Sequence, residues 1–427
     1  MDIFIKILWA FASALIILLS IYFTFDLNFL QFKFKNYKKC FKSNKVDNVG
    51  ITPLKTLMLT LAGRIGVGSI AGVSLAIYIG GAGTIFWLWV ISIISLPLAF
   101  LETSLGSLYK RKSGKEFVGG PSYYIKYGLH NKKLAIVYAI LIILSFITGF
   151  LGIQVNTITK AAITIIPIPK ILVGVILMVL TFLIVIGDVF KISESTSKMV
   201  PFMLIFYVVL CLLVIFNHFN DLGNVIKSII KSAFSLKPFF SGFLYTMIIG
   251  IQRGIFSSET GLGTGSITAS ASNSLDFSKD GYLQMLGVSI TTLVVCTITS
   301  FIVLLSPFQN ISLNDVNGIE IASFSFGYHF GSLGTILMFI FIFLCSFSTI
   351  LTGYYDSLVS LKFIFNKHQN VQKWFLIILT LIMILISSIV SSNFMWQMVD
   401  LFVGILIIIN LYAIYKLKDK VKGKINI

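Results

Sequence analysis

Long apolar runs, separated by short basic or glycine-rich stretches, set the pattern along this chain. Each run is long enough for a membrane-spanning α-helix, since about 20 apolar residues cross the hydrocarbon core. The pattern therefore predicts an all-α polytopic membrane protein with about 11 transmembrane helices. Their expected ranges are 3–24, 60–83, 85–108, 134–158, 170–187, 200–216, 240–273, 282–306, 332–361, 372–392 and 394–415.

Two of these runs are interrupted by glycines and charges. The first, within 60–83, reads TLAGRIGVGSIAGVSLAIYIGGAG, and the second, within 250–272, reads GIQRGIFSSETGLGTGSITASAS. Lipid does not tolerate unpaired backbone groups, so an unwound segment at membrane depth must lie beside a cavity or a ligand. Two broken helices in matching positions of two halves point to the binding site of a secondary transporter.

Basic residues between the runs predict the topology, because cytoplasmic loops carry an excess of Lys and Arg. The lysine-rich stretch after the first run and the basic loop 110–133 place the amino terminus outside and the carboxyl terminus in the cytoplasm. The two broken helices then begin two groups of five helices with opposite orientation, an inverted repeat. Residues 307–330, which hold no Lys or Arg, are expected to form an external loop. The expected units are a leading helix with a basic loop (1–50), the first repeat (51–217), an external amphipathic segment (218–239), the second repeat (240–415) and a basic tail (416–427).

Composition agrees with this picture. Of 427 residues, 57% are hydrophobic and 11% charged, against about 25% charged in soluble domains, and the mean hydropathy is +0.95. The net charge of +17 comes from lysines in a few loops, which is a membrane-topology pattern and not a nucleic-acid-binding one. The four cysteines form no CxxC motif, so neither disulfides nor a metal site is expected.

The first break suits a carboxylate. Free N–H groups of Val67, Gly68 and Ser69 at the start of a half-helix can bind an anion, and glycine lets a ligand approach the backbone. The alternative is a small-residue face for helix packing. Gln154, on a neighbouring run, can donate and accept hydrogen bonds and is either a substrate contact or a bond between helices.

Buried charges accompany both breaks. Arg64, Arg253 and Glu259 lie within the apolar runs, where a charge costs at least about 2.5–3.5 kcal/mol and must be paired or face water. A structural tie between Arg and Glu and a gating or coupling role are both open.

A cation site is expected between the first break and the eighth apolar helix after the leading one. Ser348 and Thr349 are adjacent hydroxyls that can face the carbonyls of Ala62 and Ile65, and oxygen ligands suit a hard cation such as Na⁺. The alternative is that both hydroxyls bond back to their own helix.

Several motifs, in order and spacing, resemble those of the alanine or glycine:cation symporter family. They are GRIGVGSIAGVSLAIYIGGAGTIFWLW, GGPSYYI, QVNTI and RGIFSSETGLG. The resemblance implies a leucine-transporter-like fold of two inverted five-helix repeats, the architecture by which such transporters are recognised. It also implies substrate contacts from Gln154, Phe256, Ser257 and Ser258.

Four positions depart from the family pattern. Ser69 and Ser258 stand where the family usually has asparagine, Ala82 where proline is usual and Thr291 where aspartate is common. Shortened or neutral side chains put the number of bound cations and the substrate range in question, but not the fold.

The expected function is a symporter of the plasma (inner) membrane that imports a small neutral amino acid, alanine or glycine first, driven by a Na⁺ gradient. H⁺ coupling, a broader substrate range and a transport-silent amino-acid sensor are the alternatives. No enzyme motif is found, and a channel would need a symmetric ring or filter. No cofactor is expected beyond the coupling ion.

Overall fold

The computed structural model describes residues 2–40, 47–235, 239–311, 318–365, 369–390 and 392–424. Within these residues, every expected apolar run is helical, and seven helices are individually long and apolar enough to cross a membrane. Two of the seven contain a π-helical turn, η3 (Phe146–Phe150) between α8 (Lys132–Ser145) and α9 (Leu151–Ile163), and η5 (Ile290–Val295) between α15 (Phe277–Ser289) and α16 (Cys296–Leu304). The other five are α1 (Asp2–Asp26), α11 (Asp188–Asn217), α18 (Ser332–Ile364), α19 (Gln369–Ile389) and α20 (Ser392–Lys422).

Both predicted breaks are confirmed. The first helix consists of α3 (Pro53–Arg64), the π-helical segment η2 (Gly68–Gly72) and α4 (Val73–Gly80), and its two halves bend by 52°. Thr52 caps the start of α3 through its side chain, and Pro53 occupies the first turn, where no N–H is needed.

The second broken helix consists of α13 (Phe239–Ser258) and α14 (Thr264–Ala269). Between them Glu259, Gly261 and Gly263 all have positive φ. Only glycine adopts that conformation at no steric cost, so the turn requires the two glycines, Gly261 and Gly263.

One helix bends where the sequence predicted a single span. Residues 85–108 fall into α5 (Gly83–Ile94) and α6 (Leu96–Leu108), which differ in direction by 45°. Pro97 is the second residue of α6, and proline cannot donate the hydrogen bond that would continue α5. The remaining apolar helix, α10 (Lys170–Val185), is shorter.

Short elements join these helices, and two of them differ from expectation. The basic loop contains a β-hairpin, β1 (Arg111–Ser113) paired antiparallel with β2 (Glu116–Val118), and residues 318–330 form a helix where a loop was expected. These residues could not be assigned from periodicity because their stability comes from packing on other elements. The short helices are η1 (Leu30–Phe32), α2 (Phe34–Cys40), α7 (Pro121–Tyr127), η4 (Phe219–Asp221), α12 (Leu222–Ala233), η6 (Phe308–Asn310) and α17 (Gly318–Phe330).

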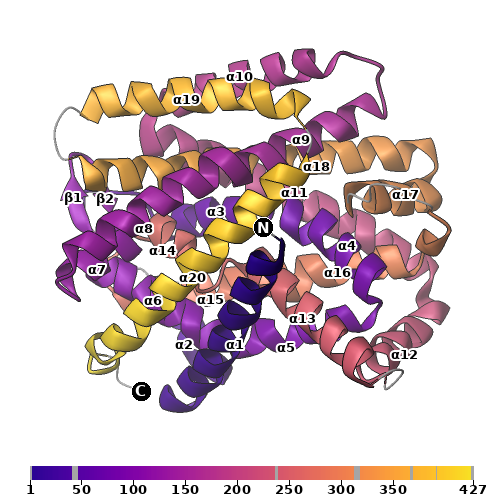
Figure 1. Cartoon of the computed structure of the whole chain (residues 1–427), viewed down its shortest axis with the longest axis horizontal. Coiled ribbons are helices and arrows are strands. Elements are labelled where there is room, and N and C mark those ends of the chain that lie inside the picture. The colour runs from indigo at the N-terminus through magenta and orange to yellow at the C-terminus, as the bar shows by residue number, and fades with distance from the viewer. Residues whose placement is uncertain are drawn as a thin grey trace.

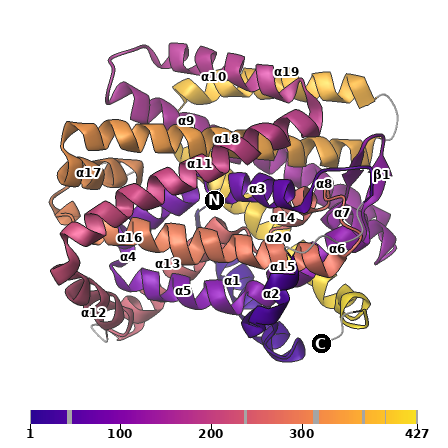
Figure 2. The ribbon, with the colours of Figure 1, turned by 180° about the vertical axis from the view of Figure 1, so that it is seen from behind.

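Figure 1 shows two opposite ends of the molecule, with the hairpin and α7 at one end and α12 and α17 at the other. The view from behind agrees (Figure 2), and in both views α10 and α19 run side by side. The basic loop therefore lies at the hairpin end. Large apolar side chains are exposed on α1, α10 and α19, for example Phe4, Ile176 and Ile378, as expected for surfaces that face lipid.

The two broken helices are joined at the hairpin end. Ile51, just before α3, forms a parallel bridge with Ser272, which follows α14. Lys110 adds two hydrogen bonds of 2.6 Å from its ammonium group to the carbonyl oxygens of Ser272 and Ser274. The start of α3 is thus joined to the segment that follows α14.

Candidate substrate and ion site

The first break meets Gln154 and Phe256, as the substrate-site prediction requires. The N–H of Val67 donates to Oε1 of Gln154 over 3.3 Å. A Cβ atom on Gly68 would lie 2.7 Å from Cδ1 of Phe256 and 3.9 Å from Oγ of Ser257. Glycine at position 68 therefore permits direct contact between the two broken helices. The N–H groups predicted to be free are partly occupied, because that of Val67 is bonded to Gln154 and that of Ser69 donates to the Gly66 carbonyl over 3.3 Å.

Phe256 belongs to an aromatic cluster between two small cavities. Its ring stacks on Phe150 with centroids 5.7 Å apart and lies 5.6 Å from the ring of Trp396. We call the first hollow the Lys160 cavity; it measures about 20 Å³ and is lined by Val67, Lys160, Gly318 and Trp396 among others.

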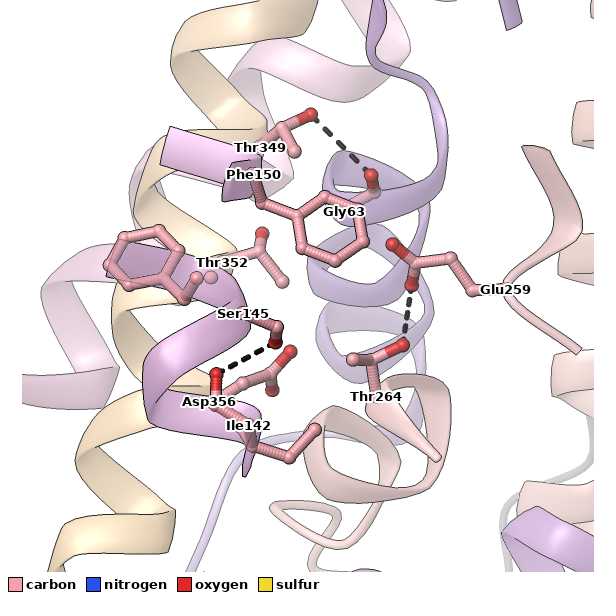
Figure 3. Close-up of a pocket in the computed structure, with 11 residues that line it drawn as sticks. Gly63, Ile142, Ser145, Phe150, Glu259, Thr264, Thr349, Thr352 and Asp356 are labelled. Carbon is pink, nitrogen blue, oxygen red and sulfur yellow. Dashed lines mark hydrogen bonds between the residues drawn. The ribbon is translucent and has the colours of Figure 1, made fainter. Parts of the chain in front are cut away.

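The second hollow, the Asp356 cavity, measures about 30 Å³ and is lined by Gly63, Ser145, Phe150, Glu259, Thr264, Thr349, Thr352 and Asp356 among others (Figure 3). Val67 and Trp396 belong to the first cavity and Phe150 to the second. Phe256, which contacts both rings, closes the space between them.

The Lys160 cavity is covered by α17. Gly318, the first residue of this helix, is in direct contact with the carbonyl of Ala71 in η2, and a Cβ atom there would overlap it. Thus α17, which lies where the sequence predicted a loop, contacts the broken part of the first helix.

Ser348 and Thr349 face the expected carbonyl. Their hydroxyl groups donate to the carbonyl oxygen of Ala62 over 3.2 Å and 2.9 Å, and that of Thr349 also approaches Gly63 at 3.4 Å. Both hydroxyls lie within 2.9 Å of the Cys345 carbonyl of their own helix as well. Ile65, directly after α3, is buried, and within the described residues no hydrogen bond joins its carbonyl to these hydroxyls.

The three predicted charges do not meet one another within the part of the chain that the structure describes. Arg64 donates from Nη1 to Oε1 of Gln284 over 2.9 Å. The guanidinium of Arg253 lies 5.4 Å from the centre of the Trp396 ring, a cation–π contact. Glu259 accepts a hydrogen bond of 2.7 Å from Thr264.

Residues that the sequence analysis missed hold the second break in shape. The N–H of Gly261 donates to Oε2 of Glu102 over 2.7 Å, and its carbonyl accepts from Nδ2 of Asn410 over 2.9 Å. The phenol of Tyr138 donates to the Leu262 carbonyl, and that of Tyr124 to Oδ1 of Asn410. The sequence did contain a signal for Glu102 and Asn410, because an acid or an amide within an apolar run is usually retained for a function.

The departures Ser69 and Ser258 both bond to backbone at the breaks. Ser69 donates to the Gly66 carbonyl over 3.0 Å, and Ser258 to the Ile255 carbonyl over 3.2 Å. Ala82 directly precedes α5, and Thr291 donates to the Gly287 carbonyl of its own helix over 3.0 Å.

Comparison with solved structures supports the fold. The chain is similar to MhsT in complex with L-phenylalanine, with a TM-score of 0.61 at 14% identity over 87% of this chain and 90% of that one. It is also similar to a manganese transporter of Eremococcus coleocola, with a TM-score of 0.55 at 13% identity over 86% and 80% of the two chains. The fold is that of the leucine-transporter-like proteins, as predicted.

Sequence comparison identifies relatives over nearly the full length. The amino-acid carrier protein AlsT and the probable sodium/glutamine symporter GlnT, both of Bacillus subtilis, are each 32% identical; the alignments cover 96% and 97% of this chain and 88% and 87% of theirs. The sodium/proton-dependent alanine carrier protein of Bacillus sp. PS3 is 27% identical over 87% of this chain and 86% of its own. These relatives are transporters and not enzymes. Residues 1–426 match the sodium:alanine symporter family, and the chain belongs to this family of amino-acid and cation symporters.

Proposed function

We propose that this protein imports a small neutral amino acid, alanine or glycine first, driven by an inward Na⁺ gradient. The observation that carries the proposal is the meeting of Gly68, Gln154 and Phe256 at the first break, next to the hydroxyls of Ser348 and Thr349. The N–H groups of the break suit a carboxylate once those of Val67 and Ser69 exchange their present acceptors, and the hydroxyl and carbonyl oxygens suit a hard cation.

The two cavities support alternating access. Trp396 lines the Lys160 cavity and Phe150 lines the Asp356 cavity, and Phe256 contacts both rings. A movement of Phe256 away from Gly68 would open the break to one cavity while the other side stays closed. A small substrate fits this arrangement, because Phe256 lies directly against the break.

The orientation is proposed from charge. The hairpin end carries the basic loop, so it should face the cytoplasm, and α12 and α17 should then lie outside. The amino terminus is placed outside by the same argument, in the plasma (inner) membrane. Residues 41–46 and 236–238, parts of the expected basic loop and of the amphipathic segment, lie outside the described residues.

Uptake of radiolabelled alanine into proteoliposomes, under an imposed Na⁺ or H⁺ gradient, tests the proposal. We expect accumulation with Na⁺ and competition by unlabelled glycine. Accumulation driven by an H⁺ gradient alone would show that the coupling ion is H⁺ and not Na⁺. Binding of alanine without accumulation would identify a sensor, and competition by glutamine would favour the broader substrate range.

A further inference from the structure

The Asp356 cavity contains a carboxyl group with one oxygen that has no hydrogen-bond partner among the described residues. Asp356 on α18 is 4% exposed, and its Oδ1 atom is enclosed without a hydrogen-bond partner. A buried carboxylate without a partner is costly, and an ionisable residue within a membrane helix marks an ion pathway by default.

A second carboxyl group faces the same space. Glu259, at the turn between α13 and α14, approaches the cavity from the side opposite Asp356 (Figure 3). Its Oε2 atom accepts from Thr264 and would lie 3.8 Å from a Cβ atom on Gly63. The two carboxyl groups come from different elements, the turn after α13 and the helix α18, but line one hollow.

The surrounding charges leave an excess of acid. Among the described residues, two carboxyl groups and no basic side chain line the cavity. Its charge therefore favours a cation.

Neutral oxygen ligands complete the surroundings. The hydroxyl-bearing side chains of Ser145, Thr264, Thr349 and Thr352 line the cavity, and so does Gly63, whose carbonyl faces Thr349. Carboxylate, hydroxyl and carbonyl oxygens are the ligands of hard cations. A cavity of about 30 Å³ is larger than the roughly 10–15 Å³ that a water needs, so an ion also fits.

We propose that Glu259 and Asp356 form a second Na⁺ site, separate from the Ala62, Ser348 and Thr349 site. Thr349 belongs to both, because its hydroxyl faces Ala62 and its side chain lines the Asp356 cavity. An ion that leaves the first site can therefore keep Thr349 as a neighbour while it moves to the second. The second site is therefore a step on the path of Na⁺ toward the hairpin end.

Equilibrium binding of radiolabelled Na⁺ to the full chain in detergent tests this inference without requiring transport. We expect two populations of bound Na⁺ in the unmodified protein. The variants Asp356→Asn and Glu259→Gln should each lower the Na⁺ affinity of the second site at least about tenfold, as for the loss of a charged ligand. Thr349→Ala should lower the Na⁺ affinity of the first site more strongly than that of the second.

Glu194→Gln is the matched control, since it removes one exposed carboxylate, paired with Lys198 on α11, and should leave both populations unchanged. Size-exclusion profiles establish that each variant is folded, and Glu259→Gln serves if Asp356→Asn does not fold. Unchanged Na⁺ binding in any folded cavity variant overturns the second site. The inference takes only the identity of the coupling ion, Na⁺, from the proposed function. Loss of Na⁺ binding in Thr349→Ala alone would support the first site and reject the second.

Discussion

The hydroxyl of Thr349 lies within hydrogen-bond distance of two carbonyl oxygens. It reaches the carbonyl of its own helix at Cys345 and that of Ala62 across the bundle, each at 2.9 Å. The hydrogen bond to the Cys345 carbonyl can remain when an ion takes the place of the contact with Ala62. Bonding to its own helix and binding an ion therefore do not exclude each other.

Thr349→Ala and Ser348→Ala should raise the Na⁺ concentration for half-maximal alanine uptake. A ligand of this kind is worth about 1–3 kcal/mol, or roughly 5–150-fold. Na⁺ titration of uptake in proteoliposomes measures the change. The matched control is Ser360→Ala on the same helix, whose hydroxyl bonds only to the Asp356 carbonyl of α18. Wild-type Na⁺ dependence in both site variants would place the ion elsewhere.

Gly68→Val should abolish alanine binding while the protein still inserts and folds. A Cβ atom at this position would lie 2.7 Å from Phe256, and a β-branched side chain also favours a regular, stiffer backbone. Binding of labelled alanine in detergent measures the loss. Gly72→Ala is the control, because its Cβ atom would meet nothing closer than 3.8 Å. Normal alanine affinity in Gly68→Val would return this glycine to a packing role.

The double change Ser69→Asn with Ser258→Asn should narrow the substrate range toward glycine and alanine. Serine is shorter than asparagine by an amide group, and space for one methylene is worth about 1–3 kcal/mol, or 10–200-fold. Competition of glycine, alanine, serine and valine against labelled alanine measures the range. An altered Na⁺ dependence with the same competition profile would assign both serines to the ion site, and no change in either would reject the idea.

At the scale of elements, the second break is a turn held by its neighbours. Gly261 is bonded through its N–H to Glu102 of α6 and through its carbonyl to Asn410 of α20. Backbone groups at this depth need such partners, because lipid supplies none. The turn that carries Glu259 is therefore rigid on the side of α6 and α20.

Asn410→Ala should destabilise the protein by about 1–3 kcal/mol, because it leaves the Gly261 carbonyl and the Tyr124 phenol unpaired. Thermal unfolding in detergent, followed by the loss of the monodisperse peak, should show a lower midpoint. Tyr412→Phe, an exposed position on the same helix, should leave the midpoint unchanged. An equal midpoint for Asn410→Ala and the control would mean that these bonds do not stabilise the turn.

At the scale of the whole molecule, the charge distribution separates two ends. Lysines and an arginine gather on the hairpin end, and α12 at the other end carries Lys227 and Lys231. The lysines of α12 run against the charge rule, and an amphipathic helix can lie along the membrane surface without crossing it. Val225 and Ile229 of α12 are buried and its lysines are not.

Cysteine labelling tests the orientation. Lys227→Cys should react with a membrane-impermeant maleimide in intact cells, and Lys132→Cys only after the membrane is opened. The native cysteines of the chain are buried and provide a low background. The unmodified protein is the control for that background. The opposite pattern of reaction would invert the proposed topology.

The apolar helices, both breaks and the family followed from the sequence alone, but the helix α17 and the bend between α5 and α6 did not. Apolar runs in lipid must be helical, and glycine-rich interruptions at that depth must serve a site, so local composition was sufficient. It also indicated Gln154, Phe256 and Thr349, because a motif fixes which side chains a break carries.

Only the tertiary structure decided which groups meet. Arg64 lies on Gln284 and not on Glu259, α17 covers η2, and Asp356 shares a cavity with Glu259. These contacts join residues far apart in the chain, and each depends on how whole helices cross. No local pattern records a partner that lies on another helix, and the packing of the bundle decided which charges are paired and which one is left facing the cavity.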